Sequence, residues 1–224
     1  TLPTLYGNGK SVLGEIPGML FLVLFLLFFH IAGLNEKKKL LFLSLSGLSA
    51  GLSIATKPTF ILLVPVLAAC LLIDWRRRRV ETKGALTFIF FAVIPVIVWA
   101  AHQFTWSDSF SRIASFYANP YRIDNIFSIG IKNLKPLFTD LGPLYLTVSM
   151  LIWAASMWLR KRKCEVISAV EVGGFIFSVL IIAAFLRTEG WYRYLVEAQI
   201  MAVIFLPQAL SDVSDAIAER FRSY

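Results

Sequence analysis

The residues best suited to chemistry are cations that stand beside long apolar stretches. Arg187 and Arg193 lie in the eight-residue segment 187–194, Arg-Thr-Glu-Gly-Trp-Tyr-Arg-Tyr. An arginine offers a planar fork of donors to phosphate oxygens, and the hydroxyl of Tyr194 adds another donor. Glu197 lies four residues after Arg193, on the same helical face, where it could orient the guanidinium. The segment predicts an anion-binding loop, and the competing interpretation is a belt of interfacial aromatics with snorkelling arginines.

A third cation, Lys57, stands alone in the apolar run 40–73. As one helix, this run would reach about 51 Å, well beyond a hydrocarbon core of roughly 30 Å. Both ends are basic, at 37–39 and 76–79, and basic clusters prefer the cytoplasmic side, so the run must turn back. The turn is expected at Thr56-Lys57-Pro58, because proline suits the first turn of a new helix.

The predicted hairpin has arms of about 25 Å, shorter than the hydrocarbon core. Lys57 is therefore expected to lie recessed below the outer surface, where a positive charge needs an anionic partner. The alternative is that Lys57 snorkels to the outer headgroups and only anchors the hairpin.

One acidic residue, Glu15, stands where a membrane span begins, followed by Pro17 in the first turn. Its charge favours a helix start, and the functional alternative is an acid that faces an outer cavity and positions a substrate. His30 and His102 have no partners at ligand spacing, so no metal site is predicted.

The composition indicates an integral membrane protein. The chain has 224 residues, 58% of them hydrophobic, and a net charge of +8, with a mean hydropathy of +0.71. The basic residues cluster between apolar runs, which is the positive-inside pattern and argues against nucleic-acid binding. Cys70 and Cys164 both fall toward the cytoplasmic side, where reduced, structural thiols are expected.

The elements that must position these residues are membrane spans, at 16–34, 40–56, 58–74, 84–103, 141–159, 167–186 and 194–210. The loops 35–39, 74–83 and 160–165 and the tail 211–224 hold 14 of the 22 Lys and Arg residues. We therefore predict an all-α, polytopic transmembrane bundle of about seven spans, with the N-terminus outside and the C-terminus in the cytoplasm. It is expected to form a single membrane domain over 1–224, in the plasma membrane.

Residues 104–140 form the one long outer loop of this topology, and it is rich in aromatics. Within 126–137, apolar residues alternate with Lys132 and Lys135, which is typical of a helix that lies on the membrane surface. The alternative is a belt of interfacial aromatics without a substrate role.

Three motifs together resemble a known family. They are Leu-Gly-Glu-Ile-Pro at 13–17, Gly-Leu-Ser-Ile-Ala-Thr-Lys-Pro at 51–58 and Trp-Tyr-Arg-Tyr-Leu at 191–195. Their order and setting resemble the middle and C-terminal membrane part of GT-C-like polytopic glycosyltransferases, namely the dolichyl-phosphate-mannose–protein mannosyltransferases and the aminoarabinose transferases of lipid A. The resemblance implies transfer of a sugar from a polyprenyl-phosphate carrier to a protein, lipid or glycan acceptor on the extracytoplasmic side.

The resemblance also implies an acidic catalytic motif in the first outer loop, which is expected upstream of Thr1. The chain begins without a methionine, which predicts a fragment of a longer protein. On its outer loops no Asp-x-Asp or Asp-Glu pair stands, so the catalytic base stays unassigned and dependence on a divalent metal stays open. Lys57, Arg187, Arg193, Tyr194 and Glu15 are the predicted substrate-binding residues.

Two other classes share the membrane topology. A multi-pass transporter or lipid flippase would also place a charge inside the bilayer, but paired repeats or broken helices at the midplane are expected there, and Pro65 and Pro95 stand as lone kinks. A seven-helix receptor shares the number of spans, but nothing in the sequence indicates signalling. The sequence does not distinguish the sugar, the acceptor or the carrier lipid.

Overall fold

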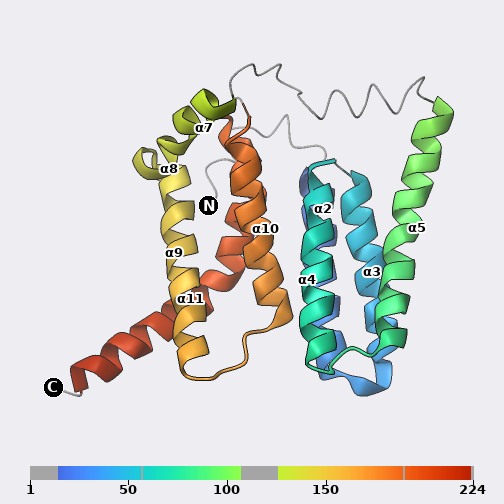
Figure 1. Cartoon of the computed structure of the whole chain (residues 1–224), viewed down its shortest axis with the longest axis horizontal. Coiled ribbons are helices and arrows are strands. Elements are labelled where there is room, and N and C mark those ends of the chain that lie inside the picture. Colours follow the sequence, from blue (N-terminus) through green and yellow to red (C-terminus); the bar gives the residue numbers. More distant parts are fainter. Residues whose placement is uncertain (1–14, 57, 107–125, 189, 223–224) are drawn as a thin grey trace. The chain divides into compact units, whose positions relative to one another are not determined.

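The computed structural model describes residues 15–56, 58–106, 126–188 and 190–222, and in these ranges the chain is helical and has no strand (Figure 1). It forms two compact units. Of the described residues, those within 15–106 belong to the N-terminal unit and those within 126–222 to the C-terminal unit. The all-helical fold class is confirmed, and a single domain over 1–224 stays a prediction.

The N-terminal unit contains four long helices: α2 (Glu15–Leu34), α3 (Lys39–Thr56), α4 (Leu63–Arg76) and α5 (Thr82–Trp106). Short 3-10 helices, η1 (Glu36–Lys38) and η2 (Pro58–Leu62), join α2 to α3 and α3 to α4. The small residues of α3 allow its backbone to pack closely. A Cβ atom added to Gly47 would lie 2.2 Å from the Phe88 carbonyl oxygen of α5, and one added to Gly51 would lie 2.2 Å from that of Ala92.

The opposite contact of α3, with α2, is made through two buried serine hydroxyls. Ser46 donates to the carbonyl oxygen of Phe25 at 3.0 Å, and Ser53 donates to that of Gly18 at 2.8 Å. In an apolar environment such bonds satisfy groups that water would otherwise satisfy. Helix α3 therefore lies between α5, which it contacts through its glycines, and α2, which it contacts through its serines.

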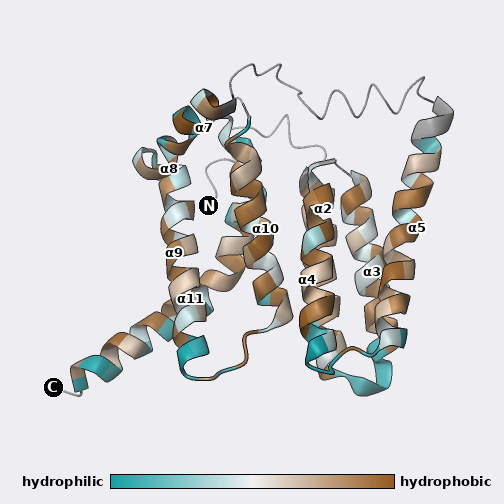
Figure 2. Cartoon of the chain, viewed as in Figure 1, coloured by the Kyte–Doolittle hydropathy of each residue, from teal (hydrophilic) through white to brown (hydrophobic). Residues whose placement is uncertain are grey.

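The predicted hairpin is confirmed. Helix α3 ends at Thr56 and η2 begins at Pro58, and α3 and α4 run in opposite directions (Figure 1). The carboxylate of Asp74 interacts electrostatically with Arg79, Arg77 and Lys39, so the two basic ends of the hairpin share one end of the unit, which is hydrophilic in Figure 2. Lys57 lies outside the described residues.

The C-terminal unit contains α7 (Ile126–Leu134), α8 (Pro136–Thr139), α9 (Leu141–Arg162), α10 (Ala169–Phe185), η3 (Tyr192–Leu195) and α11 (Val196–Arg222). Its core is built on Trp153 of α9, whose side chain is fully buried. The indole stacks on Phe205 of α11, with ring centroids 4.6 Å apart, and meets Phe175 of α10 edge-on at 5.2 Å. The ring of Trp153 thus joins α9, α10 and α11 in one aromatic cluster.

Among the described residues, six helical segments are long and apolar enough to cross a membrane: 16–34, 36–56, 59–76, 82–102, 141–162 and 192–222. The remaining predicted span, 167–186, corresponds to α10, which is apolar but has 17 residues. The prediction that 211–224 is a tail is wrong as to secondary structure, because α11 continues to Arg222. The orientation in the membrane stays a prediction.

Candidate functional site

The loop between α10 and α11 begins with a tight turn at the end of α10. The backbone amide of Arg187 donates to the carbonyl oxygen of Ala184 at 3.0 Å, and that of Thr188 donates to Phe185 at 3.0 Å. Gly190 has a φ of +85°, a conformation that glycine adopts without steric cost. The turn leaves the side chain of Arg187 exposed, so its guanidinium is accessible at this end of the unit.

Aromatic rings hold the side chain of Arg193. Its guanidinium carbon lies 4.3 Å from the ring centroid of Trp191 and 5.2 Å from that of Tyr194, and the two rings are nearly parallel, at 5°. One terminal nitrogen of Arg193 also donates to the Tyr194 hydroxyl at 3.4 Å. The structure therefore brings two predicted site residues, Arg193 and Tyr194, into contact.

One donor of Arg193 lacks a protein partner among the described residues. Its Nε is buried and has no hydrogen-bond partner within the described part of the chain, and no ion pair between Arg193 and Glu197 occurs there. This differs from the expectation that Glu197 orients the guanidinium. The ring faces contact the guanidinium without neutralising its charge, so Arg193 can still pair with an anion.

Sequence reasoning missed Asp140, which holds this loop from the side of α9. The hydroxyl of Tyr192 donates to one carboxylate oxygen of Asp140, and Thr139 Oγ1 donates to the other at 2.8 Å. The hydrogen bonds from Tyr192 and then Thr139 hold the pKa of Asp140 below its ordinary value. Asp140 and Tyr192 are 52 residues apart in sequence, so no local motif could have revealed the pair.

The other two predicted site residues belong to the N-terminal unit. Glu15 begins α2, as expected of a helix-start residue, but its side chain and Lys57 lie outside what the structure describes. Their grouping with Arg187 and Arg193 therefore stays a prediction. In the described ranges, no group of three or more His, Cys, Asp and Glu side chains is arranged to hold a metal ion.

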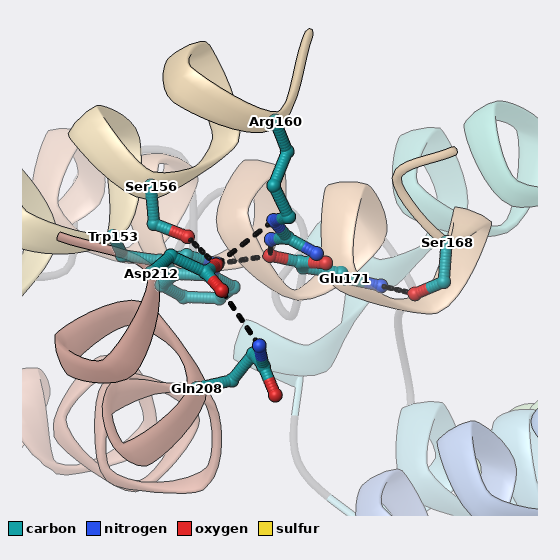
Figure 3. Close-up of polar contacts among 7 residues, drawn as sticks. All are labelled: Trp153, Ser156, Arg160, Ser168, Glu171, Gln208 and Asp212. Carbon is teal, nitrogen blue, oxygen red and sulfur yellow. Dashed lines mark hydrogen bonds and ion pairs between the residues drawn. The ribbon is translucent and has the colours of Figure 1, made fainter. Parts of the chain in front are cut away.

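A second arginine of the C-terminal unit, Arg160, has a different environment (Figure 3). It pairs with Glu171, and its Nε lies 3.0 Å from an oxygen of Asp212. Trp153 Nε1 donates to Glu171 at 3.2 Å, and Ser156 donates to Asp212. Two carboxylates thus surround one guanidinium, which suits a contact that joins α9, α10 and α11 rather than a ligand site.

Comparison with known protein families gives a match over the N-terminal part of the chain. Residues 4–99 match the family model of the dolichyl-phosphate-mannose-protein mannosyltransferases. The match includes the motifs at 13–17 and 51–58 and confirms the predicted resemblance to a GT-C-like, mannosyltransferase-type membrane protein. Neither a curated protein nor a solved structure matches the chain.

The mannosyltransferase match suggests glycosyltransferase activity. The match ends before the loop 187–194, so the role of this loop is inferred from its geometry alone. The cations of the loop lie at the end of the apolar helix α10 and at the start of the segment 192–222, which is long and apolar enough to span a membrane. That arrangement is suited to a lipid-linked anion, whose charged group lies at the membrane boundary while its tail stays in the bilayer.

Proposed function

We propose that this chain forms the membrane part of a glycosyltransferase that takes a sugar from a polyprenyl-phosphate-linked donor. The observation that carries the proposal is the mannosyltransferase match over residues 4–99. The arrangement of Arg193 supports it, because a guanidinium that rests on ring faces and forms no ion pair among the described residues can pair with a phosphate. The acceptor is a protein, lipid or glycan on the extracytoplasmic face of the plasma membrane.

The proposed chemistry follows from the charges that develop during transfer. As the sugar leaves its carrier, positive character builds at the sugar carbon and negative charge builds on the departing phosphate. Arg193, Arg187 and Lys57 would stabilise the phosphate, and Glu15 would position the substrate. An acidic group must accept the proton of the acceptor hydroxyl, and no residue of this chain is assigned that role.

Lys57, which stands between α3 and η2 in the sequence, is the second cation that we propose to bind the phosphate. In Lys57→Met an unbranched apolar stem remains and the charge is lost. If Lys57 binds the carrier phosphate, donor KM should rise or kcat should fall by roughly ten- to a thousandfold, for a loss of about 1.4–4 kcal/mol. Unchanged donor kinetics in a variant with normal melting would leave Lys57 as an anchor only.

The orientation is proposed from the distribution of basic residues and can be tested by labelling. Single cysteines at Glu81 and Arg162 should be shielded from an impermeant thiol reagent added outside intact cells, and a cysteine at Thr188 should react. The two native cysteines, Cys70 and Cys164, are replaced first. Outside labelling at position 81 would contradict the proposed topology.

The activity itself is tested on the complete purified protein in proteoliposomes. Radiolabelled polyprenyl-phosphate sugars are supplied with candidate protein, lipid and glycan acceptors, and product is separated by chromatography. The proposal predicts sugar transfer that depends on the donor. Movement of a labelled lipid across the bilayer, without transfer to any acceptor, would instead indicate a transporter or flippase.

A further inference from the structure

The two short helices α7 and α8 form one continuous segment with three distinct faces. Lys135, which joins them, has helical φ and ψ angles. One face is apolar and exposed, with Phe127 79% and Phe138 61% exposed. Residues three or four positions apart share a face. The exposed apolar face consists of Phe127, Ile131, Leu134 and Phe138, and the polar face consists of Ser128, Lys132, Lys135 and Thr139. Asn133 and Leu137 form the third face, which is buried.

The position of the segment identifies what covers its apolar face. Asp140 joins α8 directly to Leu141, the first residue of a candidate membrane span. Hydrogen bonding reinforces this junction, because Thr147 of α9 donates to the carbonyl oxygen of Leu137 at 2.9 Å. The segment is thus fixed at the end of an apolar helix, at the boundary of the bilayer.

The chemistry of the exposed faces matches that boundary. An interfacial helix buries its apolar face among acyl chains and directs its lysines toward headgroups. Here the lysines at 132 and 135 stand on the polar face, one residue on from the apolar positions Ile131 and Leu134. The bilayer interface is therefore the occupant that fits both faces at once.

The buried face of the segment is hydrogen-bonded to the end of α10 and to the loop 187–194, which carries Arg187 and Arg193. Asn133 Nδ2 donates to the carbonyl oxygen of Thr188 at 2.7 Å and to that of Phe185 at 3.3 Å. These carbonyls lie at the C-terminal end of α10, where backbone acceptors lack helical partners. The fit is close, since a Cβ atom added to Gly190 would lie 2.6 Å from Asn133 Oδ1.

A second attachment lies on the other side of Arg193. Asp140, directly after α8, accepts a hydrogen bond from the Tyr192 hydroxyl, and Tyr192 is the residue before Arg193. The loop is thus bound to the segment before Gly190 through Asn133 and after it through Asp140. A shift of the segment would move both ends of the loop together.

We propose that α7 and α8 form a brace in the membrane interface that holds the loop 187–194 at headgroup depth, with Asn133 and Asp140 as positioning residues. The consequence for donor binding rests on the proposed function, because it assumes that Arg193 meets a lipid-linked phosphate. The seating of the brace in the bilayer and its grip on the loop do not depend on sugar transfer.

The seating is tested by spin labels on the complete protein in lipid vesicles, with Cys70→Ala and Cys164→Ser as the background. A label at Ile131 should be relaxed by oxygen, which concentrates among acyl chains, and a label at Lys132 by a water-soluble nickel complex. Accessibility of both labels to the nickel complex would overturn the seating in the bilayer. Protection of Ile131 from both agents would also overturn it, since another protein surface would then cover the apolar face.

The hydrogen bonding of Asn133 to the loop is tested by Asn133→Ala, with Lys132→Gln as the control on the exposed polar face. A label at Arg187 should become more mobile and shift in depth in Asn133→Ala but not in Lys132→Gln. If Asn133→Ala does not fold, Tyr192→Phe tests the second attachment in the same way. An unchanged label spectrum in a folded variant would overturn the grip, whether or not sugar transfer is detected.

The kinetic readout joins the brace to the proposed reaction. With Arg187 intact, donor KM should rise about three- to tenfold in Asn133→Ala while kcat changes little, as expected for the loss of a hydrogen bond that positions a binding group. An unchanged donor KM in a variant whose loop has loosened would overturn the role of Asn133 in donor binding. A protein without any transfer activity would contradict the proposed function and leave the label results standing.

Discussion

Two arginines of the C-terminal unit, Arg160 and Arg193, show how the surroundings of a cation decide its use. Both stand at the ends of long apolar helices, and both are largely enclosed. Arg160 meets two carboxylates, those of Glu171 and Asp212. Arg193 meets two aromatic rings and forms no ion pair among the described residues.

The difference separates a structural cation from a binding one. Removing one member of a buried ion pair leaves the others unpaired, so the cost appears as lost stability. Removing a guanidinium that rests on rings breaks no ion pair among the described residues, so stability should change less. A ligand anion that the guanidinium would have bound loses its partner instead, and the cost appears in binding.

The largest effect predicted from this comparison concerns Arg160. Arg160→Ala should lower the free energy of unfolding by about 3–5 kcal/mol, because Glu171 and Asp212 are left without their cation. Thermal unfolding in detergent measures it. The control is Lys163→Ala, which removes an exposed ion pair with Glu219 and should barely change the melting temperature. Equal melting of Arg160→Ala and wild type would remove the distinction between the two arginines.

The next effect concerns the geometry of the binding cation. Arg193→Lys keeps the charge but replaces the planar fork by a point charge that cannot bind two phosphate oxygens side by side. We expect the ratio kcat/KM for the donor to fall at least about tenfold, with normal insertion and melting. Near-wild-type kinetics in Arg193→Lys would mean that a positive charge without the planar fork is sufficient for donor binding at this position.

A smaller effect is expected at the ring that supports Arg193. Tyr194→Phe keeps the ring face and removes the hydroxyl that Arg193 contacts at 3.4 Å. Donor KM should rise only about two- to fivefold, as for one weak hydrogen bond. A loss as large as that of Arg193→Lys would show that the hydroxyl itself binds substrate.

The smallest effect is a pH dependence at Asp140. Its pKa is lowered by hydrogen bonds from Tyr192 and Thr139, so its contribution to stability is fully present above the ordinary aspartate pKa of about 3.9 and is lost as pH falls through the lowered value. The mobility of a label at Arg187 should therefore be constant from about pH 8 to pH 5 and rise only below about pH 4. Loosening near pH 6 would contradict this assignment.

Local sequence signals predicted most of the helices. The break at Thr56 and Pro58 followed from the length of an apolar run with basic residues at both ends, and the helix beginning at Ile126 followed from its periodicity. Both depend on neighbours in sequence, which a single chain displays directly. The end of α11 was missed because the charges of its last turns looked like a tail, although they lie on a helix.

Contacts between distant residues could not be predicted in this way. Asp212 meets Arg160 across 52 positions, and Asn133 meets the carbonyl oxygen of Thr188 across 55. Neither pair carries a local pattern, because the folded helices bring the partners together. The surroundings of Arg193 are a different case, since Trp191 and Tyr194 are its neighbours in sequence, but the sequence does not show that their rings face its guanidinium.

The central claim is that Arg193 binds the phosphate of a lipid-linked donor, and donor-concentration kinetics on Arg193→Ala test it most directly. The complete protein is purified as wild type and variant, and melting is checked in both. We predict that donor KM rises or kcat falls by roughly ten- to a thousandfold, with melting and acceptor KM unchanged. Wild-type kcat and donor KM in a properly folded Arg193→Ala would contradict the claim and leave the loop as an interfacial anchor.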